Sequence, residues 1–371
     1  MYCASTEATE RFRQRFGSAD PSHFRPLQQL WASSIGLGTY LGDADDATDA
    51  RYAEAIRTAL AHGCNVLDTA INYRCQRSER TIGATVAALV HDQAIARDEL
   101  ILCTKGGYLP FEGAVPRDPG RHLIDTVINA GLAPHEEIVA GCHCLWPAYL
   151  DHALTTSLAN ARVETLDVYY LHNPEQQLEE VPRETFWARL EAAFALLERR
   201  AREGAISIYG LATWNGLRVA PTAKNFLSLE TAVELAARVG GPDHHFRVIQ
   251  LPYNLAMPEA YAFKNQAVRG EPLTVLQAAE RLGLSVMVSA SLLQSQLTRL
   301  PASLEARIPG CATSAQRAVQ FVRSTPGVTT ALVGMQQCRH VEENLALAKQ
   351  PLLPVDAIGR IFDRSKRPSH A

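Results

Sequence analysis

The feature that most constrains the fold of this chain is a regular alternation of two kinds of segment. Short apolar runs typical of buried strands are followed by longer stretches with the apolar spacing of a helix. The alternation occurs roughly eight times, which is the strand number of a closed α/β barrel. The predicted strands are Ile35–Gly38, Cys64–Asp68, Leu100–Thr104, Leu166–Leu171, Ile206–Leu211, Arg247–Leu251, Leu284–Ser289 and Thr329–Gly334.

Helices are predicted between these strands, and several of them end on glycine. They cover Asp49–His62, Arg77–Leu89, Ala148–Arg162, Glu184–Glu203, Leu229–Val239, Pro272–Leu282, Ser314–Ser324 and Arg339–Ala348. Gly63, Gly204 and Gly283 each follow a helical stretch and are followed at once by a strand. Glycine adopts the left-handed backbone that ends many helices. The order helix, glycine, strand therefore predicts βα units and a parallel sheet, and the near-continuous apolar strands indicate burial on both faces.

The alternative to a barrel is an open, doubly wound sheet. That fold would place a Gly-rich phosphate turn after an early strand, and no G-x-G-x-x-G stands there. We therefore expect one (β/α)8 TIM barrel over residues 33–350, with an N-terminal extension over 1–32 and a C-terminal tail over 351–371. Two long connections, Gly106–Pro147 and Leu251–Glu271, follow strands and should lie on the C-terminal face, where active sites of such barrels form.

Composition excludes several classes of protein. The 371 residues are 47% hydrophobic and 20% charged, which argues against a disordered chain. Lys and Arg total 36 against 39 Asp and Glu, so the net charge of -3 gives no reason to expect nucleic acid as a partner. No run of about 20 apolar residues predicts a membrane span, and the first residues do not resemble a secretory signal.

The cysteines indicate a reducing compartment. Most of the 8 lie inside apolar runs and should be buried free thiols, so we expect a cytoplasmic protein. Cys142-His143-Cys144 lacks a second pair of ligands at a suitable spacing, and we predict no metal site.

Polar side chains stand at or just after the ends of three consecutive predicted strands. Asp68 ends the second strand, Tyr73 follows it, Lys105 comes directly after the third and His172 directly after the fourth. A lysine at the end of a buried strand needs a partner, which Asp68 can supply. A nearby cation would lower the pKa of the Tyr73 phenol, so that it could exchange a proton near neutral pH. A histidine on the next strand could hold the oxygen that receives this proton.

At these positions the chain resembles the aldo-keto reductase family, from about Ile35 to about Lys349. The matching motifs are Gly36-Leu37-Gly38-Thr39, Leu67-Asp68-Thr69-Ala70 with Tyr73, Ser78-Glu79 with Ile82-Gly83, Thr104-Lys105, Leu166 to His172, and Glu343-Asn344-Leu345. The resemblance implies a TIM barrel that uses NADPH, with NADH possible, and a catalytic tetrad of Asp68, Tyr73, Lys105 and His172. Tyr73 would be the general acid, and hydride would come from the nicotinamide.

The same resemblance implies where the cofactor and substrate bind. The implied cofactor residues are Thr39, Tyr40, Thr213, Gln250, Ser289, Leu292, Gln294, Gln296, Gly334, Gln336, His340, Glu343 and Asn344. Ser289 stands where the family usually has an aromatic ring against the nicotinamide. Tyr108, Trp146 and Trp214 are candidates for the substrate pocket. Arg339 and His340 are the basic residues near the expected 2′-phosphate position.

Two other functions remain open on the same residues. Lys105 could form a Schiff base in a non-redox barrel enzyme, or the chain could sense a cofactor with little turnover. The leading prediction is a carbonyl reductase or alcohol dehydrogenase that acts on a small carbonyl or alcohol. The loops that set specificity in this architecture do not identify the substrate, and the sequence does not indicate an oligomeric state.

Overall fold

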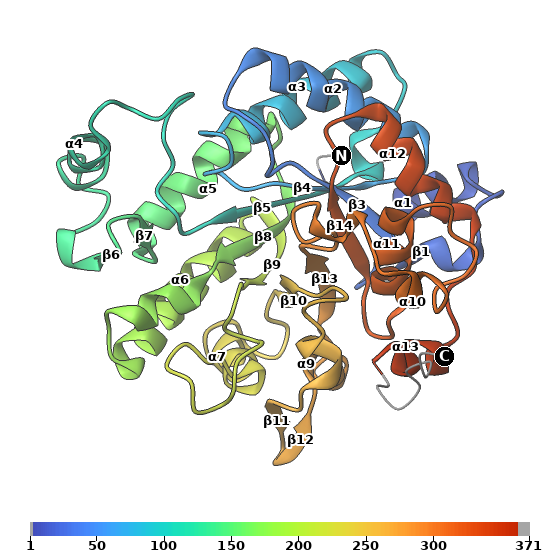
Figure 1. Ribbon diagram of the computed structural model, residues 1–371. Coiled ribbons are helices and arrows are strands. Elements are labelled where there is room, and N and C mark those ends of the chain that lie inside the picture. Colours follow the sequence, from blue (N-terminus) through green and yellow to red (C-terminus); the bar gives the residue numbers. More distant parts are fainter. Residues whose placement is uncertain (1–2, 363–371) are drawn as a thin grey trace.

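The centre of the computed structural model is a closed barrel of parallel strands, and the residues described are 3–362 (Figure 1). Around the barrel the strands follow the order β10, β13, β14, β3, β4, β5, β8 and β9. Their bounds are β3 Ile35–Gly38, β4 Val66–Asp68, β5 Ile101–Gly106, β8 Leu166–His172, β9 Ile206–Ala212, β10 Phe246–Pro252, β13 Ser285–Ser289 and β14 Thr330–Gly334. Each predicted strand overlaps one of these, so the predicted (β/α)8 barrel is confirmed.

A layer of helices surrounds the barrel (Figure 1). The helices that follow the barrel strands are α2 Asp46–Ala61, α3 Arg77–His91, α5 Pro147–Ala161, α6 Arg183–Arg202, α7 Leu229–Gly240, α9 Val275–Arg281, α11 Ser314–Ser324 and α12 Cys338–Leu345. Gly63, Gly204 and Gly283 have φ of 86°, 82° and 70° after α2, α6 and α9. This left-handed backbone is the helix end that the sequence predicted.

Two predicted helix starts were wrong, because a capping side chain sets the true one. The helix expected from Pro272 begins at Val275, where the Thr274 hydroxyl accepts from the backbone N–H of Gln277. The residues before it, Glu271–Leu273, form β12 and pair with β11, Gln266–Val268. Similarly, α2 begins at Asp46 rather than Asp49, because the Asp45 carboxylate accepts from the N–H of Thr48 at 2.7 Å.

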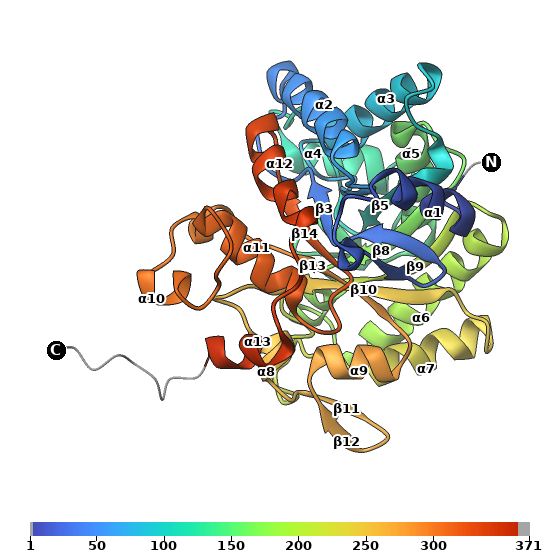
Figure 2. The ribbon, with the colours of Figure 1, turned by 90° about the vertical axis from the view of Figure 1, so that its right-hand side faces the viewer.

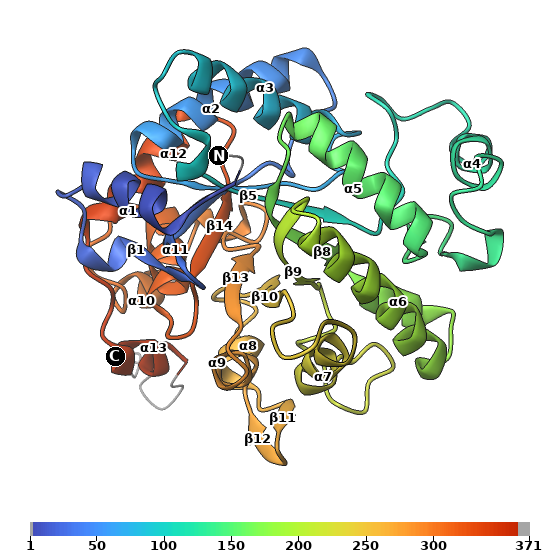
Figure 3. The ribbon, with the colours of Figure 1, turned by 180° about the vertical axis from the view of Figure 1, so that it is seen from behind.

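The N-terminal segment closes the amino end of the barrel. It contains α1, Thr6–Arg15, and a hairpin of β1, Phe24–Leu27, and β2, Leu30–Ser33 (blue in Figures 2 and 3). Leu27 and Ala32 of this hairpin are fully buried against the apolar side chains inside the barrel. That inner cluster also contains Val66, Ile101, Cys103, Val168, Tyr170, Ala212, Val248, Met287 and Leu332. The barrel is therefore packed solid below its carboxyl end.

The long connection after β5 leaves the barrel and carries elements of its own. It contains α4, Pro119–Leu123, and a small pair of strands, β6 Ile138–Val139 and β7 His143–Cys144, which lie beyond the ring of helices (Figures 1 and 3). Shorter additions are α8 Glu259–Ala262, α10 Ala302–Glu305 and α13 Val355–Ile361. The predicted C-terminal tail is described as far as Phe362, and residues 1–2 and 363–371 of the two predicted extensions lie outside the described residues.

Candidate functional site

The predicted catalytic side chains come from three neighbouring strands. β4, β5 and β8 are adjacent in the barrel. Asp68 is the last residue of β4, Lys105 is next to last in β5, and His172 is the last residue of β8. Tyr73 lies in the turn after β4. Because parallel strands end at the same mouth, the four side chains meet there, and their catalytic roles stay a prediction.

A buried ion pair forms the floor of this site. The Lys105 Nζ lies 2.7 Å from Asp68 Oδ2 and also donates to the Thr69 carbonyl at 2.7 Å. Their side chains are 1% and 7% exposed. Gln250, predicted to hold a cofactor, donates its amide N–H to the other oxygen of Asp68 at 2.8 Å. Burial alone would lower the pKa of Lys105, but Asp68 and Tyr73 outweigh it and raise the pKa.

Tyr73 stands between the ammonium group and the imidazole. The Lys105 Nζ lies 5.1 Å from the centre of the Tyr73 ring, and the rings of Tyr73 and His172 are 5.8 Å apart at 77°. The ring of Tyr40 also packs against Tyr73, with the ring centres 5.0 Å apart. The phenol is therefore held by contacts on several sides at the mouth of the barrel.

The pKa of Tyr73 differs from the sequence-based expectation. Burial of the phenol raises its pKa, and the nearby Lys105 lowers it by less than burial raises it. The sequence-based expectation that the cation would lower the pKa of Tyr73 overall was therefore wrong for the protein without ligands. The sequence indicated the charge next to the tyrosine but not how far the hydroxyl is removed from water. At neutral pH the phenol carries its proton.

His172 is held from behind by a chain of hydrogen bonds that the sequence did not predict. Arg189 donates to the Gln177 amide oxygen at 2.6 Å, which directs the amide N–H toward His143 Nδ1 at 2.9 Å. His143 therefore carries its proton on Nε2, which donates to the His172 carbonyl at 2.8 Å. Burial lowers the pKa of His143 to about 4 and that of His172 well below its usual value, so both rings are neutral.

A cavity of about 450 Å³ opens above these residues. Asp68, Tyr73 and His172 line it, while Lys105 lies below its surface. The predicted cofactor and substrate residues that line it are Thr39, Tyr40, Tyr108, Thr213, Trp214, Gln250, Ser289, Leu292, Gln294 and Gly334. The sequence did not single out Asn72 and Asn173, which also line the cavity; their polar character alone was the available signal.

The remaining predicted residues lie away from this cavity. They are Trp146, directly before α5, Gln296, and four residues just before or within α12: Gln336, His340, Glu343 and Asn344. Glu343 accepts from the Thr313 hydroxyl at 2.5 Å, so it joins α12 to the start of α11. Asn344 is buried, and its Oδ1 has no hydrogen-bond partner within the protein.

Unpaired polar atoms indicate where a polar ligand fits. Thr213 Oγ1, Ser291 Oγ and Asn72 Oδ1 are buried without a hydrogen-bond partner, and all three residues line the cavity. A buried polar atom without a partner is costly. Two hydroxyls and one amide oxygen therefore fit a ligand that carries several hydrogen-bonding groups, as a nicotinamide nucleotide does.

The loop after β9 is fixed by a carboxylate that the sequence did not reveal. One oxygen of Glu175 accepts from the backbone N–H groups of Trp214, Asn215 and Gly216 at 2.7, 2.9 and 3.1 Å. Glu175 follows His172 by three residues. It therefore connects the loop after β8 to Trp214 on the wall of the cavity.

Comparison with known proteins identifies the family. The model of the aldo/keto reductase family matches residues 34–299. The chain belongs to this family. A 6-dehydroglucose reductase from Novosphingobium aromaticivorans is 28% identical over 163 residues, which span 42% of this chain and 43% of that protein. The matched region thus covers under half the length of that curated relative.

Solved aldo-keto reductase structures share the fold at low sequence identity. One from Klebsiella pneumoniae, in complex with NADP and acetate, is 21% identical with a TM-score of 0.59 and covers 92% of this chain and 94% of its own. The holo form of one from Bacillus halodurans is 18% identical with a TM-score of 0.63, covering 94% and 98%. Among residues 3–362, no helix of this aldo-keto reductase is long and apolar enough to cross a membrane.

The ion pair at the floor of the site gives a prediction about stability. Lys105→Met leaves the Asp68 carboxylate buried without its charged partner, so the free energy of unfolding should fall by about 3–5 kcal/mol. Removing both charges in Asp68→Leu/Lys105→Met should restore most of that loss. Urea denaturation measures both. As a control, Arg281→Gln breaks an exposed pair with Glu271 and should cost less than about 1 kcal/mol. A stable Lys105→Met variant would contradict the prediction.

Proposed function

We propose that this chain is an NAD(P)H-dependent carbonyl reductase in which Tyr73 is the proton donor. The carrying observation is the cluster of Asp68, Lys105, Tyr73 and His172 at the bottom of one cavity. Membership of the aldo/keto reductase family supports the same reaction. The reverse reaction would oxidise an alcohol.

The nicotinamide group supplies a hydride to the substrate carbonyl when it is bound. The protein supplies the proton and a positive charge that stabilises the group left after the proton is transferred. Tyr73, protonated at neutral pH, donates its phenol proton to the carbonyl oxygen. The Asp68 carboxylate stabilises the protonated, positively charged form of Lys105. This ammonium group can in turn stabilise the phenolate that Tyr73 becomes. The neutral imidazole of His172 orients the carbonyl oxygen.

The geometry also supports this reaction over Schiff-base chemistry at Lys105. Attack on a carbonyl requires a free amine. Lys105 has a raised pKa, a carboxylate at 2.7 Å and a 1% exposed side chain. It therefore stays protonated and lies below the cavity surface rather than inside the cavity.

We propose that the cofactor contacts Thr213, Gln250, Ser289, Leu292, Gln294 and Gly334 within the cavity, and the predicted residues in and just before α12 beyond it. NADPH is the favoured nucleotide. Arg339 is exposed and His340 is half-buried in the first turn of α12, so both can approach an added phosphate. The similar aldo-keto reductase structures from Klebsiella pneumoniae are complexes with NADP or NADPH.

We further propose that the substrate is a hydroxylated carbonyl compound, such as a sugar derivative. Asn72, Asn173 and Tyr108 line the same cavity as His172 and carry amide and hydroxyl groups. Tyr40 and Trp214, 55% and 41% exposed, present aromatic faces at the same cavity. The partial relative that is named a 6-dehydroglucose reductase supports this class.

A cytoplasmic location is proposed from the eight cysteines, all of which are free thiols.

Turnover of a carbonyl panel with NADPH tests the function, and Tyr73→Phe tests the acid. The panel should include hydroxylated and plain aliphatic carbonyls, with higher kcat/KM expected for the first group.

Tyr73→Phe keeps the ring and removes the hydroxyl. It should lower kcat by about 10²-fold or more while nucleotide affinity, measured by calorimetry, stays nearly unchanged. Wild-type turnover by the variant would refute the assignment.

The pH dependence follows from the raised pKa of Tyr73. Carbonyl reduction needs the protonated phenol, which persists at every pH below its pKa. The reduction rate should therefore stay level through neutral pH and fall only above the ordinary tyrosine pKa of about 10. Alcohol oxidation needs the phenolate, so its rate should rise over the high-pH range in which the reduction rate falls. Steady-state rates in both directions measure this, and a reduction rate that declines through neutral pH would contradict it.

Nucleotide preference can be tested at the start of α12. The double variant Arg339→Ala/His340→Ala removes both basic side chains near the expected 2′-phosphate. Calorimetric titration should show a loss of NADPH affinity of about 10-fold, equivalent to roughly 1.4 kcal/mol, and a smaller change for NADH. Equal losses would mean that the phosphate is bound elsewhere.

A further inference from the structure

The turn that follows Tyr73 has an unusual backbone. Arg74, Cys75 and Gln76 have φ of 49°, 56° and 70°, so three consecutive residues with side chains occupy the left-handed region. This region costs an L-residue other than glycine on the order of 1 kcal/mol. Such a turn persists only where its surroundings hold it. The proposed proton donor, Tyr73, is attached directly to it.

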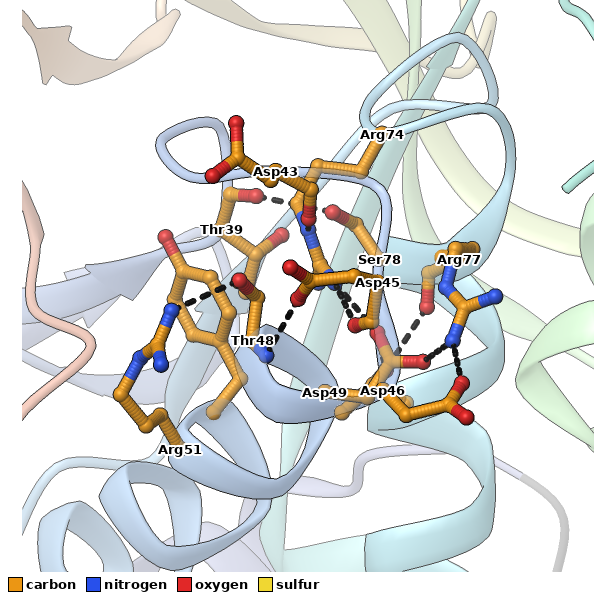
Figure 4. A network of polar contacts seen from close by, with 12 residues as sticks. Thr39, Asp43, Asp45, Asp46, Thr48, Asp49, Arg51, Arg74, Arg77 and Ser78 are labelled. Carbon is orange, nitrogen blue, oxygen red and sulfur yellow. Dashed lines mark hydrogen bonds and ion pairs between the residues drawn. The ribbon is translucent and has the colours of Figure 1, made fainter. Parts of the chain in front are cut away.

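The Arg74 side chain holds this turn by a set of buried contacts (Figure 4). Its guanidinium donates to the backbone carbonyls of Asp43 at 2.8 Å and Asp45 at 3.2 Å, and it forms an ion pair with Asp49. It also lies 5.4 Å from the centre of the Tyr52 ring. The side chain is 1% exposed. A charge buried to this extent is stable only because these partners surround it.

The two carbonyls belong to the loop after β3, residues 39–45. This loop begins at Thr39, whose backbone N–H donates to the Asp68 carbonyl at 3.1 Å. Ser78 donates to the Thr39 carbonyl at 2.8 Å from the start of α3. The next residue, Tyr40, packs its ring against Tyr73. The loop therefore contacts Tyr73 through Tyr40 while Arg74 binds two of its carbonyls.

We propose that Arg74 is a positioning residue for the proton donor. By holding the loop of residues 39–45 against the turn after β4, it fixes the phenol of Tyr73 between Lys105, His172 and Tyr40. This inference rests on the proposed function, because it assigns the purpose of the arrangement to proton transfer. It adds a residue outside the predicted tetrad that acts through Tyr73 and not on the substrate.

A neighbouring arginine provides a matched control. Arg77 also pairs with Asp49, and with Asp46, but within residues 3–362 its side chain donates to no carbonyl of the 39–45 loop (Figure 4). Arg77→Gln therefore removes an ion pair at the same carboxylate and leaves the loop attached. Arg74→Gln removes the ion pair, and its shorter side chain cannot donate to both carbonyls. Arg74→Gly removes the side chain and also relieves the strained φ, so it covers the case in which Arg74→Gln does not fold.

The first readout does not depend on activity. Hydrogen–deuterium exchange of the nucleotide-free protein should rise about tenfold or more for peptides covering 39–45 and 70–77 in Arg74→Gln and Arg74→Gly. In Arg77→Gln these peptides should change by less than about twofold. No rise in the Arg74 variants would overturn the claim that Arg74 holds the loop.

The second readout is proton transfer. In both Arg74 variants, kcat for carbonyl reduction should fall about tenfold or more, because a displaced acid loses its alignment. The fall in rate at high pH should also move to lower pH, since a loosened turn lets water reach the phenol and reduces the raising effect of burial. Arg77→Gln should leave kcat and the pH profile unchanged. A purely stabilising role for Arg74 would lower the unfolding temperature without moving the pH profile.

The outcomes separate the two proposals. Faster exchange with unchanged kcat and pH profile would overturn the positioning role and leave the proposed function intact. If the wild-type protein reduces no carbonyl and binds no nucleotide, the proposed function fails, and the exchange measurement still decides whether Arg74 holds the loop.

Discussion

The site depends on one ion pair buried at the carboxyl mouth of the barrel. Asp68 and Lys105 face each other from adjacent strands at 2.7 Å. The second oxygen of Asp68 accepts from Gln250, which belongs to β10. In the barrel order, β4 and β10 are separated by three strands on either side, so this hydrogen bond spans the barrel. The carboxylate therefore joins opposite walls of the barrel as well as neutralising the lysine.

The apolar packing of the barrel interior explains the protonation states of Lys105, Tyr73 and His172. The barrel interior is filled by hydrophobic side chains and closed at its amino end by Leu27 and Ala32. In such surroundings a charge persists only beside its partner. Lys105 keeps its proton because Asp68 is next to it. The Tyr73 phenol stays neutral because burial raises its pKa by more than Lys105 lowers it, and the His172 imidazole stays neutral because burial lowers its pKa. The site thus contains one fixed cation, one neutral acid and one neutral ring.

The sequence was sufficient for the barrel because its signals are local. Apolar runs, helical spacing and glycine ends such as Gly63 lie within single segments, and the eight barrel strands follow from them. The N-terminal hairpin was predicted only as an extension, because Pro26 within a four-residue strand gives a weak strand signal. The start of α9 was predicted three residues early because the cap at Thr274 is a finer signal than hydrophobic spacing.

Other features of the site could not be read from the sequence, because they depend on distance and depth. Gln250 and Asp68 are separated by 182 residues, and nothing near either one indicates their contact. The role of His143 was equally hidden. The sequence weighed Cys142-His143-Cys144 only as a metal motif and predicted no metal site, whereas the His143 ring forms hydrogen bonds with His172 and Gln177. The direction of the Tyr73 pKa shift required knowledge of burial as well as of the nearby charge.

The loops around the mouth are each attached to the site by a buried polar group. Glu175 binds three backbone N–H groups beside Trp214, and His143 binds the His172 carbonyl from the long connection after β5. Arg74 does the same for the loop that carries Tyr40. In each case a buried charge or ring would be left without its partner if the loop moved away, so displacement is costly. Asp68, Lys105 and His172 on the barrel strands and Tyr73 in the turn after β4 form the candidate site. By holding the surrounding loops, these three side chains would give that site the rigidity that the proposed proton transfer requires.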